Sequence, residues 1–439
     1  MYFVYSLLLT LGFLVLLPRF LFDALRHGKY VAGFGERMGR LAPLKRTGQP
    51  VVWLHCVSVG ESQAARPLVA GIRQRFPDHS IVVSTTTLTG QKLAREIFKS
   101  EAARVFYFPF DWRWTVRRSL RAIRPNSVLI METEIWPRFF RECQAQGIPL
   151  AIVNGRLSSQ SFRRYNGIKF FIKKVLPALT RAVMQTETDA GRIIELGLDQ
   201  SRVAVSGNMK FDVGVTSGSS SLLAEFCDRY HISEATQMFI AASTHAPEEE
   251  VVLEALAQAK RPNLRLLIAP RHPERFDDVA SLLDQSGLHW SRRSSPPRGS
   301  DKFCDAILLD SIGELSALYS LATIVFVGGS ISTTGGHNIL EPAAVGAAII
   351  TGPHTHNFAA ITRAFIQAGA IAQLRSGNNQ ESAIALAVAI NYLLSNDARR
   401  LELQTRAKQL VELNRGATER TLHYLEPILT GGTPSSFIT

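Results

Sequence analysis

Cysteine is scarce in this chain of 439 residues, and its four copies stand far apart at Cys56, Cys143, Cys227 and Cys304. They form no CxxC pair and no cluster with metal-ligand spacing. We therefore expect reduced thiols and a reducing compartment.

Several functional signatures are missing as well. The chain has no GxSxG elbow and no GxxxxGK[ST] loop, which disfavours a serine hydrolase and a P-loop NTPase. It has no RNP-like, zinc-finger or helix-turn-helix signature, so we expect no nucleic-acid partner. The segment 33–39 misses the dinucleotide-binding spacing by one residue and precedes every predicted strand, so we do not interpret it as an NAD site.

Strong overall hydrophobicity is also missing, because the mean hydropathy is only +0.05. The chain is 46% hydrophobic and 20% charged, as is usual for a globular protein, and it is long enough for two or three domains. A polytopic membrane protein is excluded, and at most one or two segments are expected to touch lipid.

The N-terminus is the most apolar part of the chain. From Met1 to Leu17 there is no charged side chain, and basic residues follow this run instead of preceding it. A cleaved signal peptide has the opposite order, so we predict a retained membrane anchor in residues 1–25, with the rest of the chain in the cytoplasm. A helix lying in the inner leaflet and a buried structural helix are the alternatives.

Positive charge exceeds negative charge by 12, and the excess is concentrated in two segments. Residues 1–50 have a net charge of +5 and residues 156–174 a net charge of +6. Such segments suit an anionic membrane surface or a phosphorylated lipid, although either can be a solvated basic face. The second segment contains Arg156, Arg163, Arg164, Lys169, Lys173 and Lys174, interleaved with Phe162, Tyr165, Phe170 and Phe171.

After Pro50 the sequence alternates short apolar runs with turns and helix-like segments. The runs are β-branched and nearly continuous in hydrophobicity, which is typical of parallel strands buried on both faces. We predict an α/β protein with two domains in tandem. The predicted strands are residues 51–57, 81–85, 105–108, 128–131, 150–153, 182–184 and 203–205, followed by 239–242, 264–269, 306–309, 324–327 and 348–351.

A segment poor in large apolar residues, 213–222, is the predicted linker between the domains. The first domain then spans 26–212 and the second 223–395, and a helical segment rich in Leu, Arg and Glu covers 396–428. Residues 291–300 contain two prolines and four serines and are predicted to form a surface loop.

The carboxyl ends of parallel strands are where open α/β sheets bind ligands. The first predicted strand runs into Ser58-Val-Gly-Glu61 and a helix-like segment, which places Glu61 near a helix N-terminus. Glu61 is either a general base at the mouth of the domain or a helix-start acid stabilised by the helix dipole.

Two further acids, Glu132 and Glu134, follow a predicted strand. If the strand continues, their carboxylates share a face and can bind a divalent metal. No Asp-x-Asp motif and no third ligand accompany them, so a single carboxylate that stabilises positive charge in a transition state is the better hypothesis. The pair His354 and His356 has no carboxylate partner and is expected to make polar surface or substrate contacts.

The second domain has features of a nucleotide site. Arg271 comes just after a predicted strand, where its guanidinium can bind phosphate in a fork geometry. Gly328-Gly329 and the segment 335–338 precede a predicted helix start at Leu340. We expect these glycines to let a ligand approach the backbone and the free amides of the helix N-terminus to face an anion, unless the glycines only form tight turns.

Six segments carry these features in a fixed order: Trp53–Glu61, Met131–Pro137, Gly207–Asp212, Ala269–Phe276, Val327–Ser330 and Gly335–Pro342. Together they make the chain resemble the Kdo transferases over essentially its whole length. These enzymes transfer 3-deoxy-D-manno-oct-2-ulosonic acid (Kdo) from CMP-Kdo to the lipid A precursor of Gram-negative bacteria.

The resemblance implies a GT-B fold, in which two Rossmann-like domains with parallel sheets face a cleft and the second domain holds most of the sugar nucleotide. It implies an inverting transfer without metal or cofactor. Glu61 is then the proton acceptor, Glu132 and Lys210 stabilise the transition state, and the C-terminal helix packs back across the domain junction. The implied CMP-binding residues are Pro270, Arg271, Ile312, Gly313, Glu314, Asn338, Ile339, Leu340 and Glu341.

The resemblance also implies the partners: CMP-Kdo, the lipid A precursor and inner-membrane lipid, at the cytoplasmic face of a bacterial inner membrane. Arg138 departs from the family pattern, in which Asn is common after Trp-Pro. A membrane-tethered sugar-nucleotide epimerase and a non-catalytic protein that binds nucleotides or anionic lipids are the alternatives. The residues expected at the acceptor or the membrane are Arg163, Arg164, Lys169, Lys173 and Lys174.

Overall fold

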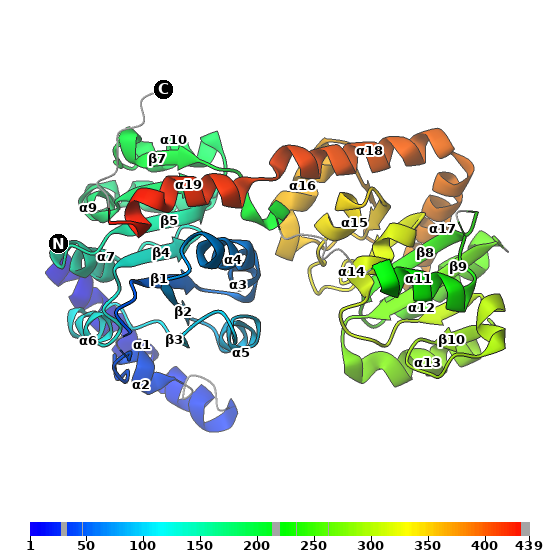
Figure 1. The fold of residues 1–439 in the computed structure, drawn as a ribbon, viewed down its shortest axis with the longest axis horizontal. Coiled ribbons are helices and arrows are strands. Elements are labelled where there is room, and N and C mark those ends of the chain that lie inside the picture. The colour runs from blue at the N-terminus through cyan, green and yellow to red at the C-terminus, as the bar shows by residue number, and fades with distance from the viewer. Residues whose placement is uncertain (28–32, 46, 213–219, 234, 262, 432–439) are drawn as a thin grey trace. The chain divides into compact units, whose positions relative to one another are not determined.

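The computed structural model describes the chain apart from residues 28–32, 46, 213–219, 234, 262 and 432–439 (Figure 1). It divides into two compact units: unit 1 is 1–213 with 414–439, and unit 2 is 214–413. Most of the predicted linker lies outside the described residues, and its last residues, 220–222, begin a helix. The four cysteines are free.

Unit 1 is built on seven parallel strands in the order β3-β2-β1-β4-β5-β6-β7. All seven predicted strands of this domain are present. The order reverses between β1 and β4, which is the switch point where doubly wound sheets bind ligands. The strands are β1 (Val51–Cys56), β2 (Ser80–Thr85), β3 (Arg104–Tyr107), β4 (Ser127–Met131), β5 (Leu150–Gly155), β6 (Arg181–Met184) and β7 (Val203–Val205).

Helices cover both faces of this sheet. Side chains alternate along β1, so Trp53 packs into the core on one face while Val52 and Leu54 pack into the core on the other. Leu422 and Leu425 of the C-terminal helix join the second core, where that helix packs on α4. The helices of unit 1 are α1 (Tyr2–His27), α2 (Phe34–Arg37), α3 (Val59–Ala64), α4 (Arg66–Arg75), α5 (Leu88–Ile97), α6 (Arg113–Ile123), α7 (Pro137–Ala145), α8 (Ser159–Gly167), α9 (Lys169–Val175), α10 (Glu187–Glu195) and α19 (Ala417–Leu429).

Unit 2 has a second sheet of seven parallel strands, in the order β10-β11-β9-β8-β12-β13-β14. The five predicted strands are its centre. The prediction missed the edge strands β10 and β14, because strands of two or three residues form by pairing with a neighbour and carry little hydrophobic pattern. The strands are β8 (Gln237–Thr244), β9 (Leu264–Pro270), β10 (Trp290–Arg292), β11 (Ala306–Leu308), β12 (Ile324–Val327), β13 (Ala348–Thr351) and β14 (Ala372–Gln373).

The core of unit 2 lies between this sheet and helices that include α12 and α17, which pack on each other. The C-terminal segment predicted as helical consists of two helices, α18 and α19, which Gly416 with a φ of 81° separates. The helices of unit 2 are α11 (Ser220–Tyr230), α12 (Glu248–Ala259), α13 (Phe276–Gln285), α14 (Leu315–Leu318), α15 (Leu340–Ala344), α16 (Ala359–Gln367), α17 (Asn379–Ser395) and α18 (Asp397–Asn414).

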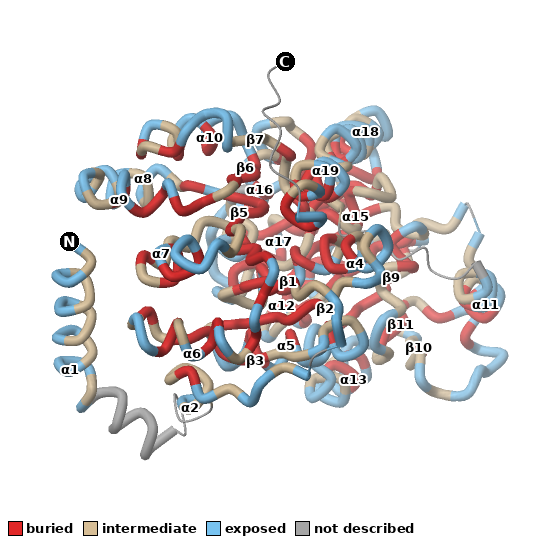
Figure 2. Tube along the Cα trace, turned by 60° about the vertical axis from the view of Figure 1, so that its left-hand side comes forward, coloured by how far each residue is buried: buried red, intermediate tan, exposed pale blue. Residues whose placement is uncertain are grey.

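One side of the N-terminal helix α1 contacts the rest of unit 1, and the other side is exposed (Figure 2). The rings of Tyr2 and Tyr5 meet Phe171 of α9, and Thr10 accepts a hydrogen bond from the Trp112 indole. No helix among the described residues has the length and hydropathy needed to cross a bilayer. The exposed apolar side chains of α1 are Phe3, Val4, Leu7, Leu8, Leu11, Leu14, Val15 and Leu16.

Candidate functional site

Glu61 lies in the first turn of α3, directly after β1. The backbone N–H of Val57 donates to its Oε2 at 2.7 Å and the Ser58 hydroxyl donates to its Oε1 at 3.1 Å. Burial and, next in size, the charge of Glu132 raise the pKa of Glu61 from 4.5 to about 8, with a smaller contribution from Glu134. A buried carboxyl with a pKa near neutrality is suited to accept a proton.

Glu132 follows β4, the strand next to β1. Its φ is 54°, so the strand does not continue, and Glu132 and Glu134 do not share a strand face as the metal hypothesis required. A left-handed conformation costs a residue other than glycine about 1–2 kcal/mol and is frequent at functional sites. Glu132 Oε1 lies 3.2 Å from Lys210 Nζ, so the structure brings all three predicted catalytic residues to one region of unit 1.

Lys210 belongs to the 3-10 turn Met209–Asp212, which follows β7. Asn154, at the end of β5, accepts a hydrogen bond from the Met209 backbone N–H at 2.9 Å and is fully buried. Its side chain thereby fixes the turn that carries Lys210. No role was predicted for Asn154, although a polar residue directly after a predicted apolar strand is a detectable signal.

The C-terminal helix also holds this turn. The Asp212 carboxylate accepts hydrogen bonds from the backbone N–H groups of Gly416 and Thr418 at 2.7 and 2.5 Å, at the start of α19. Asp212 therefore caps α19 from a distant part of the sequence. The position of Lys210 depends on a helix that lies about two hundred residues away in the chain.

The predicted CMP-binding residues follow three strands of unit 2. Pro270 and Arg271 come after β9, residues 312–314 after β11, and residues 338–341 after β12. These strands and β8 are consecutive in the sheet, in the order β11-β9-β8-β12, so the residues gather at one edge. The exposed guanidinium of Arg271 makes no hydrogen bond or ion pair with a described residue, so it is available to an anion.

The glycine loop after β12 is held by a side chain of unit 2. The carboxylate of Glu248, at the start of α12, is fully buried and accepts hydrogen bonds from the backbone N–H groups of residues 329–332 at 2.7 to 3.2 Å. These amides are therefore occupied by a side chain and do not face a ligand. A glutamate some eighty residues earlier in the chain takes the place that an anion would have on them, whereas the anion expected at the start of α15 stays a prediction.

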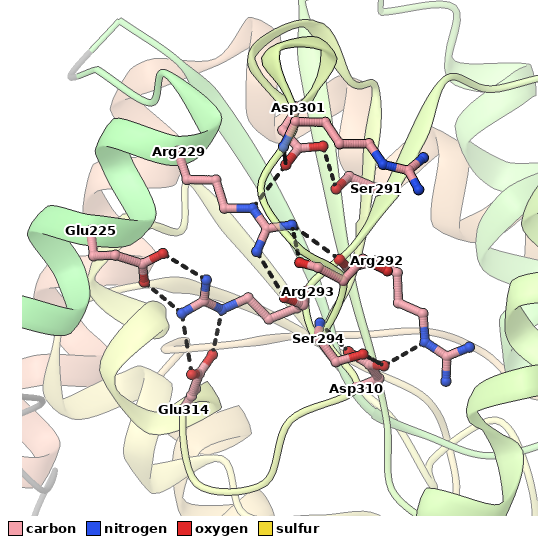
Figure 3. A network of polar contacts seen from close by, with 11 residues as sticks. Glu225, Arg229, Ser291, Arg292, Arg293, Ser294, Asp301, Asp310 and Glu314 are labelled. Atoms are coloured by element: carbon pink, nitrogen blue, oxygen red, sulfur yellow. Dashed lines mark hydrogen bonds and ion pairs between the residues drawn. The ribbon is translucent and has the colours of Figure 1, made fainter.

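A network of arginines and acids holds Glu314, the last residue of the turn 312–314 (Figure 3). Arg293 Nε donates to Glu314 Oε2 at 2.8 Å, and both terminal nitrogens of Arg293 bind Glu225 of α11 at 2.6 and 2.9 Å. The carboxylate of Glu314 is thus paired within the protein, while Ile312 is 84% exposed and Gly313 has a φ of 95°. The backbone and Ile312 are what this turn offers to a nucleotide.

The same network corrects the prediction of a surface loop at 291–300. Ser291 and Arg292 end the strand β10. Arg229, which is 8% exposed, binds Asp301 at 2.9 Å and the carbonyl oxygens of Arg293 and Ser295 at 2.8 and 2.9 Å. Arg229 of α11 thus fixes the start of this segment, and only its end, 296–300, is uniformly exposed.

The residues around the start of α15 divide into two kinds. Ile339 and Leu340 are buried and belong to the core, so only their backbone can reach a ligand. Asn338 donates to Glu341 Oε1 at 2.9 Å and accepts from the Leu340 backbone N–H at 3.1 Å. Asn338 and Glu341 therefore hold each other in place.

The basic residues predicted at the acceptor or the membrane lie on α8 and α9. Most of them are exposed, and so are Ile168 at 44% and Phe170 at 65%. Tyr2 of α1 donates to the Lys174 backbone oxygen at 3.2 Å, so this basic surface adjoins the apolar helix α1. The exposed cations are Arg163, Arg164, Lys173 and Lys174, whereas Lys169 is partly buried.

Metal-ligating side chains do not gather in the described part of the chain: no three His, Cys, Asp or Glu residues there are arranged to hold an ion.

Comparison with known proteins gives the family that the sequence motifs resemble. A family model described as 3-Deoxy-D-manno-octulosonic-acid transferase (kdotransferase) matches residues 32–213. The 3-deoxy-D-manno-octulosonic acid transferase of Haemophilus influenzae is 33% identical over 409 residues, which cover 92% of this chain and 93% of that protein. The enzyme of the same name from Bordetella pertussis is 33% identical over 405 residues and 90% of each chain.

The solved structures support the fold. The complex of MnaA from S. aureus with UDP matches 89% of this chain and 100% of its own, with a TM-score of 0.54 and 15% sequence identity. Two parallel sheets with helices on their faces and this likeness make the architecture GT-B. The chain therefore belongs to the family of 3-deoxy-D-manno-octulosonic acid (Kdo) transferases, and it is a glycosyltransferase.

Proposed function

We propose that the protein transfers Kdo from CMP-Kdo to the lipid A precursor in lipopolysaccharide biosynthesis, with inversion and without a metal. The observation that carries the proposal is the group formed by Glu61, Glu132 and Lys210 at the strand ends of unit 1. It combines a buried carboxyl of raised pKa with an ion pair, in a chain of this family.

Glu61 acts as the general base. Inversion in a single displacement needs a group that takes the proton of the acceptor hydroxyl on the face opposite the leaving group. The pKa of about 8 for Glu61 makes the deprotonated carboxylate strongly basic while a useful fraction of it is present at neutral pH.

Glu132 and Lys210 stabilise the charges of the transition state. Breaking the bond between the sugar carbon and phosphate builds positive charge on the sugar ring, which the Glu132 carboxylate offsets. Lys210 faces the sugar carboxylate, and Arg271 in unit 2 binds the departing phosphate. These fixed charges supply the stabilisation that a metal ion gives in other glycosyl transfers.

The lipid acceptor meets the protein at the membrane surface in this proposal. We infer that α1 lies in the cytoplasmic leaflet of the inner membrane, because one side of it contacts unit 1 and the other is apolar and exposed. The adjoining cations of α8 and α9 then meet lipid headgroups or the phosphates of the acceptor.

The reaction is tested with CMP-Kdo and tetraacylated lipid A precursor, by following CMP release and the mass of the lipid. A product heavier by one or more Kdo units, with CMP release that requires the acceptor, supports transfer. CMP release from folded protein that does not depend on the acceptor, together with an unchanged lipid, contradicts it. An epimerase would convert a nucleotide sugar with no acceptor present.

The membrane placement is tested by sedimentation with vesicles. The double variant Lys173→Glu/Lys174→Glu should bind vesicles with anionic lipid more weakly than wild type, whereas Lys92→Glu/Lys99→Glu, two exposed positions elsewhere in unit 1, should bind normally. Equal binding and full activity of the first variant on membrane-embedded acceptor would exclude a role for α9.

A further inference from the structure

Three histidines of unit 2 come together where β8, β9 and the glycine loop end. His245 Nε2 lies 2.7 Å from His337 Nε2, and the two ring planes are nearly parallel, with an interplanar angle of 6°. The ring of His272 meets that of His245 edge-on at a centroid distance of 5.1 Å. We name His245, His272 and His337 the histidine cluster. No motif that implied the CMP-binding residues assigned a role to any of the three.

Glu248 and Gly329 support the cluster from below. Glu248 accepts a hydrogen bond from the His245 backbone N–H at 3.0 Å as well as those of the glycine loop. The His337 ring lies against Gly329, where a Cβ atom would be 2.8 Å from the ring. Glu248 and Gly329 therefore position the partly buried imidazoles of His245 and His337, and the loop amides serve this purpose instead of binding a ligand directly.

The cluster has an excess of basic groups. Burial is the largest cause that lowers the pKa of both His245 and His337. His245 is the next cause for His337, Arg271 and His272 lower the pKa of both, and Arg275 also lowers that of His245. The pKa of His337 falls to about 4. Glu248 acts in the opposite direction on His245, but its carboxylate is already saturated with backbone donors. Arg275 is paired with Glu249, whereas Arg271 has no acidic partner among the described residues.

The hydrogen bond between the two histidines limits what they can donate. Two neutral imidazoles that share one Nε2–H have a single further N–H between them, whereas the singly protonated pair has two. An arriving anion favours the protonated form, because its charge offsets the repulsion from Arg271 and His272. Both effects make the pair a better phosphate ligand once it has gained a proton.

We propose that the histidine cluster, together with Arg271, binds the phosphate group of the nucleotide donor, and that His245 and His337 gain one proton from solvent as it binds. This inference rests on the proposed donor, a nucleoside monophosphate ester of a sugar. When the sugar–oxygen bond breaks, its electron pair stays on the phosphate oxygen and adds one negative charge. The imidazolium of the pair offsets this charge, while the proton of the acceptor goes to Glu61.

The test is calorimetric titration of the full-length protein with CMP at pH 7.5, in two buffers of different ionisation enthalpy. Wild type should take up a measurable fraction of a proton. His337→Gln and His245→Gln should lose that uptake and bind CMP about tenfold more weakly, which corresponds to the loss of one charge-assisted contact. Cytidine, which lacks the phosphate, should bind equally to wild type and variants. The matched control is His289→Gln, an exposed histidine of unit 2.

Two results would overturn the inference: wild-type CMP affinity and proton uptake in both variants, or an equal loss for cytidine and CMP, which would indicate general damage to the site. A wrong donor is recognised separately. If wild type binds neither cytidine nor CMP, titration with inorganic phosphate decides: phosphate binding with proton uptake that His337→Gln abolishes supports the cluster as a phosphate site, and no phosphate binding refutes it.

Discussion

Lys210 Nζ lies 3.2 Å from Glu132 Oε1, although Lys210 follows β7 and Glu132 follows β4, three strands away in the sheet. The turn 209–212 brings Lys210 close to Glu132 because Asn154 binds the start of the turn and the first residues of α19 bind its end. The ion pair gives the region a cation beside three carboxylates, of which Glu61 and Glu134 have raised pKa values.

Removing the charge of Lys210 should stop catalysis without unfolding unit 1. We expect Lys210→Met to lower kcat about 100-fold to 1,000-fold, as is typical for the loss of one group that stabilises transition-state charge. CMP affinity should be unchanged, because unit 2 holds the proposed CMP-binding residues. Lys92→Met, at an exposed lysine of α5, is the control. A kcat within threefold of wild type for Lys210→Met would remove Lys210 from the mechanism.

The pH dependence of kcat/KM should report Glu61. A base works only when deprotonated, so its raised pKa predicts that activity is lost as pH falls through about 8, with roughly one tenth of the carboxyl ionised at pH 7. Glu132→Gln removes the negative charge that, after burial, contributes most to the raised pKa of Glu61. The fall of the remaining activity toward acid pH should therefore occur at a lower pH than in wild type. If kcat/KM of Glu132→Gln fell at the same pH as that of wild type, the electrostatic coupling of Glu61 and Glu132 would be contradicted.

Asp212 should connect the C-terminal helix to catalysis. In Asp212→Ala the first turn of α19 loses its cap, which should lower the free energy of unfolding by about 1 kcal/mol. The turn that carries Lys210 should also lose its position, so kcat should fall more than the CMP affinity. Chemical denaturation and single-turnover kinetics measure the two effects, with the exposed Asp78→Ala as control. Unchanged kcat in a destabilised variant would make the role of Asp212 purely structural.

Arg138 should hold α1 against unit 1. Its Nε donates to the Ser6 hydroxyl at 2.8 Å and its terminal nitrogen to the Tyr2 carbonyl at 2.6 Å. Arg138→Asn removes both bonds, so amide exchange in residues 2–10 should become about fivefold faster, as expected for a loss of about 1 kcal/mol. CMP binding should not change. Exchange in α1 that matches wild type, or that the control Arg121→Asn accelerates equally, would refute this role.

The sequence was informative where local patterns decide the structure. The buried strands were predictable because β-branched apolar runs are typical of a parallel sheet, and the strand ends then indicate Glu61, Glu132 and Arg271 as candidates. Arg138 was visible only as a departure from a family pattern. Its function as a bridge to α1 required the structure.

The remainder depends on contacts between distant residues. No local pattern indicates that Glu248 accepts hydrogen bonds from the amides of the glycine loop, or that Arg293 forms an ion pair with Glu314. The two edge strands of unit 2 were missed for the related reason that they exist only through their neighbours. Side chains that satisfy buried donors or pair distant charges are chosen by the tertiary structure, so single-sequence reasoning assigns them to ligands or loops.

The most direct test of the proposed mechanism is Glu61→Gln, which keeps the size of the side chain and removes its basicity. CMP titration and single-turnover transfer from CMP-Kdo to the lipid A precursor are measured on the same preparation. We predict wild-type CMP affinity, with transfer at least about 100-fold slower across pH 6 to 9. Transfer near the wild-type rate in Glu61→Gln would contradict the assignment of Glu61 as the base.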